Sequence, residues 1–217
     1  MAYTRFSTDN ADYVLELGNH SFENHHDCYD GIDALVVENV GLDLRGVLSL
    51  NHPQLRRPLQ NCSENRTPIF GVDIYSDEDD RFFLRNLPIF LTLHYYGYRY
   101  TGQANDLTMQ LCDFWNRLFP GPEIVGRNVV NARKIEEYVA PLVGERIGRK
   151  PSIGLVYGAA HLGLKRDITD KTLRDLTLSE LEAGRWKGLE IEKLNVVYEA
   201  NHDGKQWHTT KHRVSLF

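Results

Sequence analysis

The sequence predicts an α/β fold in which a mainly parallel central sheet is flanked by helices and followed by a C-terminal antiparallel β-hairpin, so that the whole sheet is mixed. Three observations predict this class. Four short apolar runs end in glycine or polar residues, as buried strands do. Helical patterns lie between the third and fourth runs, and such alternation is typical of α/β proteins. The C-terminal segment has the pattern of two strands joined by a turn.

The four apolar runs are the expected strands of the central sheet, at residues 12–18, 32–39, 67–74 and 151–160. The second and the fourth are nearly continuous in Val, Ile and Leu. That composition is typical of strands covered on both faces, as in a parallel sheet.

Three helical segments are expected. Residues 128–147 carry apolar side chains at helical spacing, and Pro141 is expected to bend or end that helix. Residues 107–119 form a second amphipathic segment that stops at the Pro-Gly-Pro of 120–122. Residues 179–183 have the pattern of the end of a third helix.

The tail of the chain predicts a hairpin with Asp203-Gly204 as its turn signal. We therefore expect the 217 residues to form a single α/β domain. Its parts are core motifs at 12–40 and 126–165, a helical insertion at about 76–125, and the hairpin at 189–217.

Composition narrows the function classes. A net charge of −5, a pI near 6.0 and scattered Lys and Arg argue against a nucleic-acid partner. The N-terminal residues lack the apolar core of a signal peptide, and the longest apolar stretch is too short to span a bilayer. The three cysteines are odd in number and widely spaced, which is typical of reduced thiols. We expect a cytoplasmic protein with no membrane partner.

Each expected strand leads into a residue that can bind a metal or move a proton: His20, Glu38, Asp73 and His161 respectively. In an open α/β sheet the ligand crevice lies outside the carboxyl ends of the strands. Two imidazoles and two carboxylates at one edge would suit a hydrolytic or redox metal site. Any one of them alone is more often a cap or turn former. Glu38 is the most informative, because a carboxylate leaving a buried strand needs a cation, a metal or hydrogen bonds.

Standard catalytic motifs are missing from the sequence. It contains no GxGxxG, P-loop, GxSxG or HExxH pattern. No motif in the sequence therefore indicates a dinucleotide enzyme, a P-loop NTPase, a serine hydrolase or a zincin.

Four stretches together resemble the TraB/TIKI family, which belongs to a wider group with ChaN-like and erythromycin-esterase-like proteins. In order, they are YVLELGNHSF, DALVVENVG, GRNVVNARKIEEYV and IGLVYGAAHLGL, covering about residues 12–40 and 126–165. Gly158 and His161 match the second GxxH motif of the family. Glu38 matches its acidic strand end, and Arg127-Asn128 matches its Arg-Asn at a helix start.

The first GxxH motif of the family is one residue shorter here, at Gly18-Asn19-His20. Glu16 or His25 stays open as a replacement for His20. Some family members are named from plasmid pheromone shutdown and look like inhibitors of peptide signalling.

The resemblance implies a divalent-metal-dependent hydrolase that acts on peptides or on another small substrate. It implies manganese, cobalt or zinc held by His20, Glu38 and His161. Asp73 or Glu16 would be the general base. Arg127, together with Asn128, would stabilise an oxyanion or hold a substrate carboxylate.

Two other readings remain open. Erythromycin-esterase-like relatives imply a metal-independent hydrolase that uses His and Glu to activate water. ChaN-like relatives imply a non-catalytic protein that binds haem or iron, and a peptide-binding regulatory role is a further form of this reading. A homodimer is also compatible with the sequence.

Overall fold

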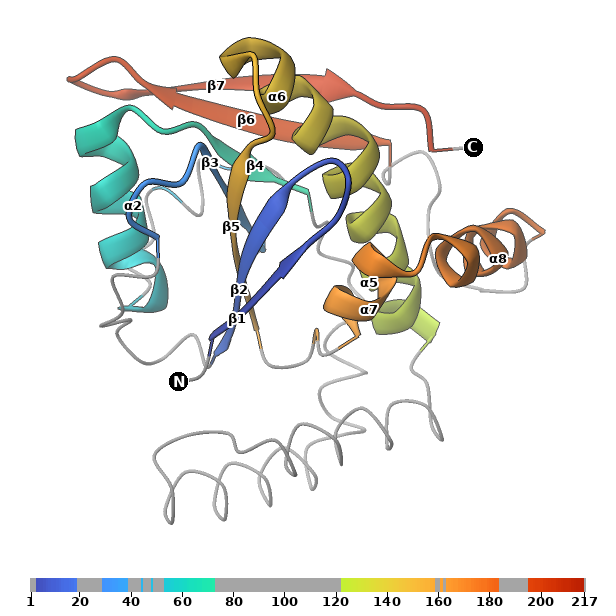
Figure 1. Cartoon of the computed structure of the whole chain (residues 1–217). Helices are drawn as coiled ribbons and strands as arrows, with labels where there is room; N and C mark the ends of the chain where they lie inside the picture. The colour runs from blue at the N-terminus through green and yellow to red at the C-terminus, as the bar shows by residue number, and fades with distance from the viewer. Residues whose placement is uncertain are drawn as a thin grey trace.

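The computed structural model describes residues 3–18, 29–38, 44, 48, 53–72, 122–158, 161, 163–183 and 195–216. The described strands form one seven-stranded sheet in the order β1-β2-β5-β3-β4-β6-β7 (Figure 1). Their bounds are β1 Tyr3–Ser7, β2 Asp12–Gly18, β3 Ala34–Val37, β4 Ile69–Gly71, β5 Ser152–Gly158, β6 Val196–His202 and β7 Trp207–Arg213. The helices are α2 Pro53–Asn65, α5 Pro122–Lys134, α6 Ala140–Ile147, α7 Leu164–Thr169 and α8 Lys171–Glu182, with a π-helical turn η1 at Ile135–Val139.

The α/β prediction is confirmed, with a sheet that is parallel at its centre and antiparallel at its edges. β2, β5, β3 and β4 run parallel to one another, whereas β1 pairs antiparallel with β2, and the β6–β7 hairpin pairs antiparallel with β4. The four parallel strands are those that the apolar runs predict. Their carboxyl ends therefore meet at one edge of the sheet, where a ligand crevice is expected.

Two buried clusters cover the two faces of the sheet. On one face, α2 packs over side chains that include Leu35, Ile69 and Val156. On the other, α5, η1 and α6, together with α7 and α8, pack over Val36 and Leu155 among others. Figure 1 shows α2 on one side of the sheet and the α5–α6 rod on the other. Because side chains alternate along a strand, neighbouring residues belong to opposite faces.

The helix expected at 128–147 does not end at Pro141. Pro141 occupies the first turn of α6, directly after the π-helical turn η1, in which the Ala140 N–H donates to the Ile135 carbonyl. A proline lacks the N–H of a normal helical bond and its ring crowds the carbonyl four residues earlier. The wider turn accommodates the proline without breaking the helix.

Of the other predicted elements, some are present in the structure and some lie outside the described residues. The β6–β7 hairpin is confirmed, and Asp203 Oδ1 accepts the backbone N–H groups of Lys205 and Gln206 in its turn, at 2.7 and 2.9 Å. The end of α8 matches the expected third helix. β1, α2 and α7 are elements that the sequence patterns did not predict. The segment 107–119 and most of the expected insertion lie outside the described residues.

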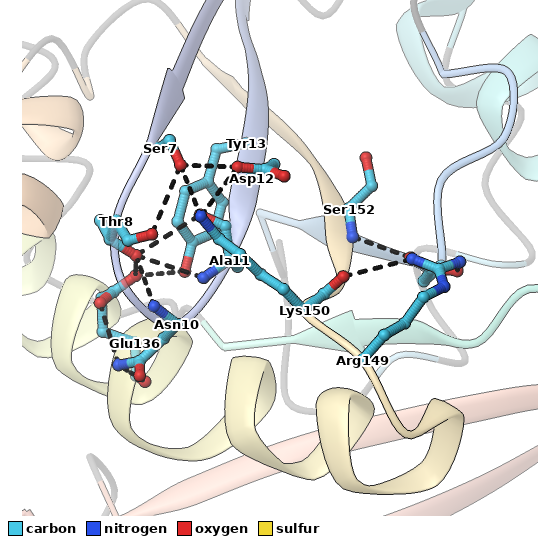
Figure 2. A network of polar contacts seen from close by, with 11 residues as sticks. Ser7, Thr8, Asn10, Ala11, Asp12, Tyr13, Glu136, Arg149, Lys150 and Ser152 are labelled. Atoms are coloured by element: carbon cyan, nitrogen blue, oxygen red, sulfur yellow. Dashed lines mark hydrogen bonds and ion pairs between the residues drawn. The ribbon is translucent and has the colours of Figure 1, made fainter.

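A polar network closes the amino-terminal edge of the sheet, opposite the carboxyl ends (Figure 2). Glu136 of η1 is buried and accepts hydrogen bonds from Thr8 Oγ1 at 2.9 Å and from the Tyr13 hydroxyl. Lys150 contacts Asp12 Oδ1 at 3.0 Å just before β5. These contacts tie the β1–β2 turn to the π-helical turn and to the start of β5. In the described part of the chain, no helix is long and apolar enough to cross a membrane.

Candidate functional site

Glu38 and His161 meet at the carboxyl edge, after the neighbouring strands β3 and β5. The Glu38 N–H continues the strand pairing by donating to the Val156 carbonyl at 3.1 Å. Glu38 Oε2 accepts the Gly158 N–H at 2.7 Å, which holds the carboxylate over the end of β5. Glu38 Oε1 then lies 3.1 Å from His161 Nε2. The sequence expectation that these two residues converge is therefore confirmed.

Asn128 contacts Nδ1, the second ring nitrogen of His161. Its Oδ1 lies 2.6 Å from His161 Nδ1, and the His161 side chain is 2% exposed. The edge of Tyr157 packs against the ring with centroids 5.1 Å apart. A buried ring held from both nitrogens and packed against an aromatic has one fixed orientation.

Arg127 contributes a positive charge beside the same carboxylate. Its NH2 lies 3.9 Å from Glu38 Oε1, and its side chain is 8% exposed. Both Arg127 and Asn128 lie in the second turn of α5. One helix therefore supplies the cation beside Glu38 and the hydrogen-bond acceptor behind His161.

The hydrogen-bond pattern determines which atoms carry protons. An amide oxygen can only accept, so Asn128 Oδ1 requires a proton on His161 Nδ1. In the neutral ring Nε2 then carries a lone pair, which faces a carboxylate oxygen of Glu38 at 3.1 Å. Two acceptors at this distance repel each other unless a positive species lies between them. That species is either a proton shared by the pair or a metal ion bound by both.

Gly163 lies close to the side-chain amide of Asn128. A Cβ at Gly163 would lie 3.3 Å from Asn128 Nδ2, 3.4 Å from Asp167 Oδ2 and 3.2 Å from Arg166 NH2. Any side chain at position 163 would press on the Asn128 amide.

The Glu38–His161 pair fits two neighbouring ligands of one metal ion. Ligand atoms about 2.0–2.1 Å from an ion, at angles between about 90° and 109°, lie roughly 2.9–3.4 Å apart. The observed 3.1 Å falls in this interval. Asn128 would act as the outer hydrogen-bond partner that metal-binding histidines usually have. Among the described residues, no group of three or more His, Cys, Asp or Glu side chains is arranged to hold a metal.

Glu16, the other acidic candidate, lies on the opposite face of the sheet. It shares the face of Val14, and its Oε2 accepts the hydroxyl of Tyr29 at 3.0 Å, on the side of α2. Tyr29 comes this close because β5 has Gly154 here, where a Cβ would lie only 2.7 Å from the tyrosine ring. The structure therefore does not bring Glu16 together with Glu38 and His161.

Two further predicted residues, His20 and Asp73, lie outside the described residues, as does His25. The described segments end at Gly18, two residues before His20, and at Val72, directly before Asp73, and Gly18 and Val72 themselves lie at the carboxyl edge of the sheet. Their roles stay predictions.

The structure also shows buried polar residues that the motif search missed. Asn131 and Lys134 follow Arg127 along α5 and are each 1% exposed. Lys134 Nζ donates to the Val72 carbonyl at 2.7 Å, at the end of β4. The signal in the sequence is the spacing i, i+4, i+7 of polar residues in a helix that places Val129, Val130 and Ala132 in the core.

Comparisons with known proteins add no family to these observations, because no family model, curated protein or solved structure matches the chain.

Proposed function

We propose that this protein is a divalent-metal-dependent hydrolase that acts on peptides. The observation that carries the proposal is the 3.1 Å separation of His161 Nε2 and Glu38 Oε1, with Asn128 Oδ1 2.6 Å behind the ring. With the Asn128 amide oxygen accepting from Nδ1, a positive species between Nε2 and Oε1 stabilises the pair, which also has the spacing of two ligands of one ion.

In this proposal each residue has a separate role. His161 and Glu38 would hold the ion, and His20 is the expected third ligand. When bound, the metal supplies a Lewis acid that lowers the pKa of water and polarises a carbonyl group. Asn128 keeps the Nε2 lone pair of His161 directed at the ion. Arg127 stabilises negative charge that develops beside Glu38.

The base that takes the proton from water is Asp73 in this proposal. Glu16 is given no part in proton transfer because it lies across the sheet. The peptide class of the substrate rests on the resemblance to the TraB/TIKI family, and manganese, cobalt and zinc are the metals to test. The proposed location is the cytoplasm, in keeping with the composition.

A metal-free hydrolase is the second candidate, and the same contact favours it. In that case a proton lies between Glu38 Oε1 and His161 Nε2. Glu38 would accept the proton of the attacking water, and the imidazolium of His161, which carries protons on both nitrogens, would hold and orient the Glu38 carboxylate. Arg127 would again stabilise the oxyanion.

The test combines metal analysis with activity. The metal content of the purified protein is measured before and after chelation. Cleavage of a peptide library is then followed with manganese, cobalt or zinc added back. Three proteins are compared: wild type, His161→Ala, and His208→Ala. The last removes an exposed histidine that pairs with Asp203 at 2.7 Å in the hairpin turn, so it is a matched loss of a His–carboxylate contact elsewhere.

We expect roughly stoichiometric metal in wild type and His208→Ala, its loss in His161→Ala, and cleavage that follows the metal. Cleavage that survives chelation but disappears in His161→Ala would favour the metal-free mechanism. If neither wild-type metal nor cleavage is found, the hydrolase proposal is wrong.

A further inference from the structure

A stripe of buried polar side chains runs along α5 beyond the Glu38–His161 pair. Arg127, Asn131 and Lys134 lie at i, i+4 and i+7, which places them on one side of the helix. They are 7%, 1% and 1% exposed. Such positions normally hold apolar side chains, as Val129 and Val130 do in the adjoining core.

An ion pair and a hydrogen bond locate the two ends of this stripe. Arg127 lies beside Glu38, at the carboxyl end of β3, with 3.9 Å between NH2 and Oε1. Lys134 donates to the carbonyl of Val72, just after β4, at 2.7 Å. β3 and β4 are neighbouring parallel strands. The stripe therefore crosses the carboxyl edge of the sheet over about 10 Å of helix, with Asn131 in the middle.

Asn131 carries the unexplained feature of the stripe. Its Nδ2 is buried and has no hydrogen-bond partner among the residues that the structure describes. A buried donor without an acceptor destabilises a fold, so natural proteins rarely keep one without a use. An apolar side chain of similar size would avoid this cost.

We propose that Asn131 is a substrate-binding residue and that the stripe is a subsite for a carboxylate of the substrate. The Asn131 amide donates to the carboxylate, and the charges of Arg127 and Lys134 on either side favour an anion there. A carboxylate supplies the acceptor that Nδ2 lacks. This inference rests on the proposed function, since it adds the recognised group to the same site.

Two sources of a carboxylate have to be told apart: the C-terminus of a peptide and an acidic side chain. Three probes separate them. N-acetylglycine carries the main-chain acid, N-acetylglutamic acid amide carries only a side-chain acid, and N-acetylglycinamide carries neither. Binding is followed by calorimetry and by the rise in Tm, and neither readout requires turnover. We expect one of the two acids to raise the Tm by about 3–6 °C at tenfold its Kd, and the neutral amide to have no effect.

Two substitutions test the role of Asn131 itself. Asn131→Leu removes the orphan donor, so we expect the Tm to rise by about 2–4 °C while acid binding falls at least tenfold. Asn131→Asp keeps the size and places a carboxylate where the ligand carboxylate would bind. It should also raise the Tm and abolish acid binding at pH 8. Asn61→Leu, on α2, is the control: Asn61 Nδ2 donates to Asp30 at 3.4 Å, so its loss should not raise the Tm or change acid binding.

His161→Ala separates this subsite from the proposed metal, because acid binding through the stripe should survive in that variant. If acid binding disappears with His161, or if acid and amide bind alike, the inference is wrong. It is also wrong if Asn131→Leu lowers the Tm while Asn131→Asp still binds the acid, which would indicate a structural water on the amide. If Asn131→Leu does not fold, acid binding by Asn131→Asp is the test: its loss supports the subsite and its retention refutes it. Acid binding that depends on Asn131 without any peptide cleavage would support the subsite and refute the hydrolase.

Discussion

Asn128 is the residue whose role can be tested most directly, because it determines the protonation of His161 without touching the proposed metal. Asn128→Ala removes the oxygen that lies 2.6 Å from Nδ1 of a ring whose side chain is 2% exposed. The Nδ1–H is then left buried without an acceptor. The proton is expected to move to Nε2, where Glu38 Oε1 accepts it at 3.1 Å. The lone pair that a metal requires is lost in that tautomer.

The size of the effect follows from the burial of the contact. Leaving one buried donor unsatisfied costs about 1–3 kcal/mol in the free energy of unfolding. For a chain of this length each kcal/mol lowers the Tm by about 2–4 °C. Loss of an outer partner of a metal-binding histidine lowers metal affinity about 10–100-fold, which corresponds to about 1.4–2.7 kcal/mol.

Long-range ¹⁵N–¹H NMR of the imidazole distinguishes the two tautomers in the protein without a substrate. We expect wild-type His161 to carry its proton on Nδ1 and Asn128→Ala to carry it on Nε2. Asn128→Asp retains an acceptor at the same place, so it should restore the wild-type tautomer and most of the metal affinity. Asn61→Ala is the matched control, since it removes a helical asparagine on the other face of the sheet.

One result would refute this reasoning. If Asn128→Ala lowers the Tm but leaves both the tautomer of His161 and the metal affinity unchanged, Asn128 has only a structural role. A positive species between His161 and Glu38 would then no longer be required.

Three further predictions concern the fold. Gly154→Ala should lower the free energy of unfolding by about 1–3 kcal/mol, measured by urea denaturation, because its Cβ would lie 2.7 Å from the Tyr29 ring. Burial acts to raise the pKa of Glu199, but hydrogen bonds from neighbours that include Arg146 outweigh it and the pKa is lowered. The Glu199 carboxylate therefore stabilises the fold above its ordinary pKa of 4.5. Glu199→Gln should lower the free energy of unfolding at pH 7, and this loss should vanish as the pH falls below that value. Equal losses at pH 3 and pH 7 would contradict this. Burial raises the pKa of Cys62 to about 12, so a thiol reagent at pH 8 should label Cys62 only after unfolding; labelling of the native protein at the same rate would refute this burial.

Glu38 shows how far the sequence alone could lead to the site. A carboxylate directly after a Val-rich strand was expected to need a cation or hydrogen bonds. The structure supplies Arg127, the Gly158 N–H and His161. The reasoning succeeded because burial of the strand follows from its composition, and a buried charge must have partners wherever the chain provides them.

For Glu16, the sequence alone could not predict whether the side chain lies on the same face of the sheet as the site. It belongs to the strand of the first motif and is as acidic as Glu38, yet it lies on the face of α2 beside Tyr29. Strand parity separates Glu16 from Leu15 and Leu17, but parity does not say which face the site will use. That choice depends on where α5 packs.

The sequence by itself determined the α/β class, the four parallel strands, the hairpin and the strand ends at which Glu38 and His161 stand. It could do so because strand burial and turn chemistry are encoded locally, in apolar runs and in residues such as Asp203-Gly204. Only the tertiary structure decided the strand order, which places β5 between β2 and β3 and so brings His161 beside Glu38. Only the packing of α5 over that edge places Asn128 beside His161. These contacts join residues 33 and 123 positions apart, and no local pattern along a chain specifies which distant segments will pack together.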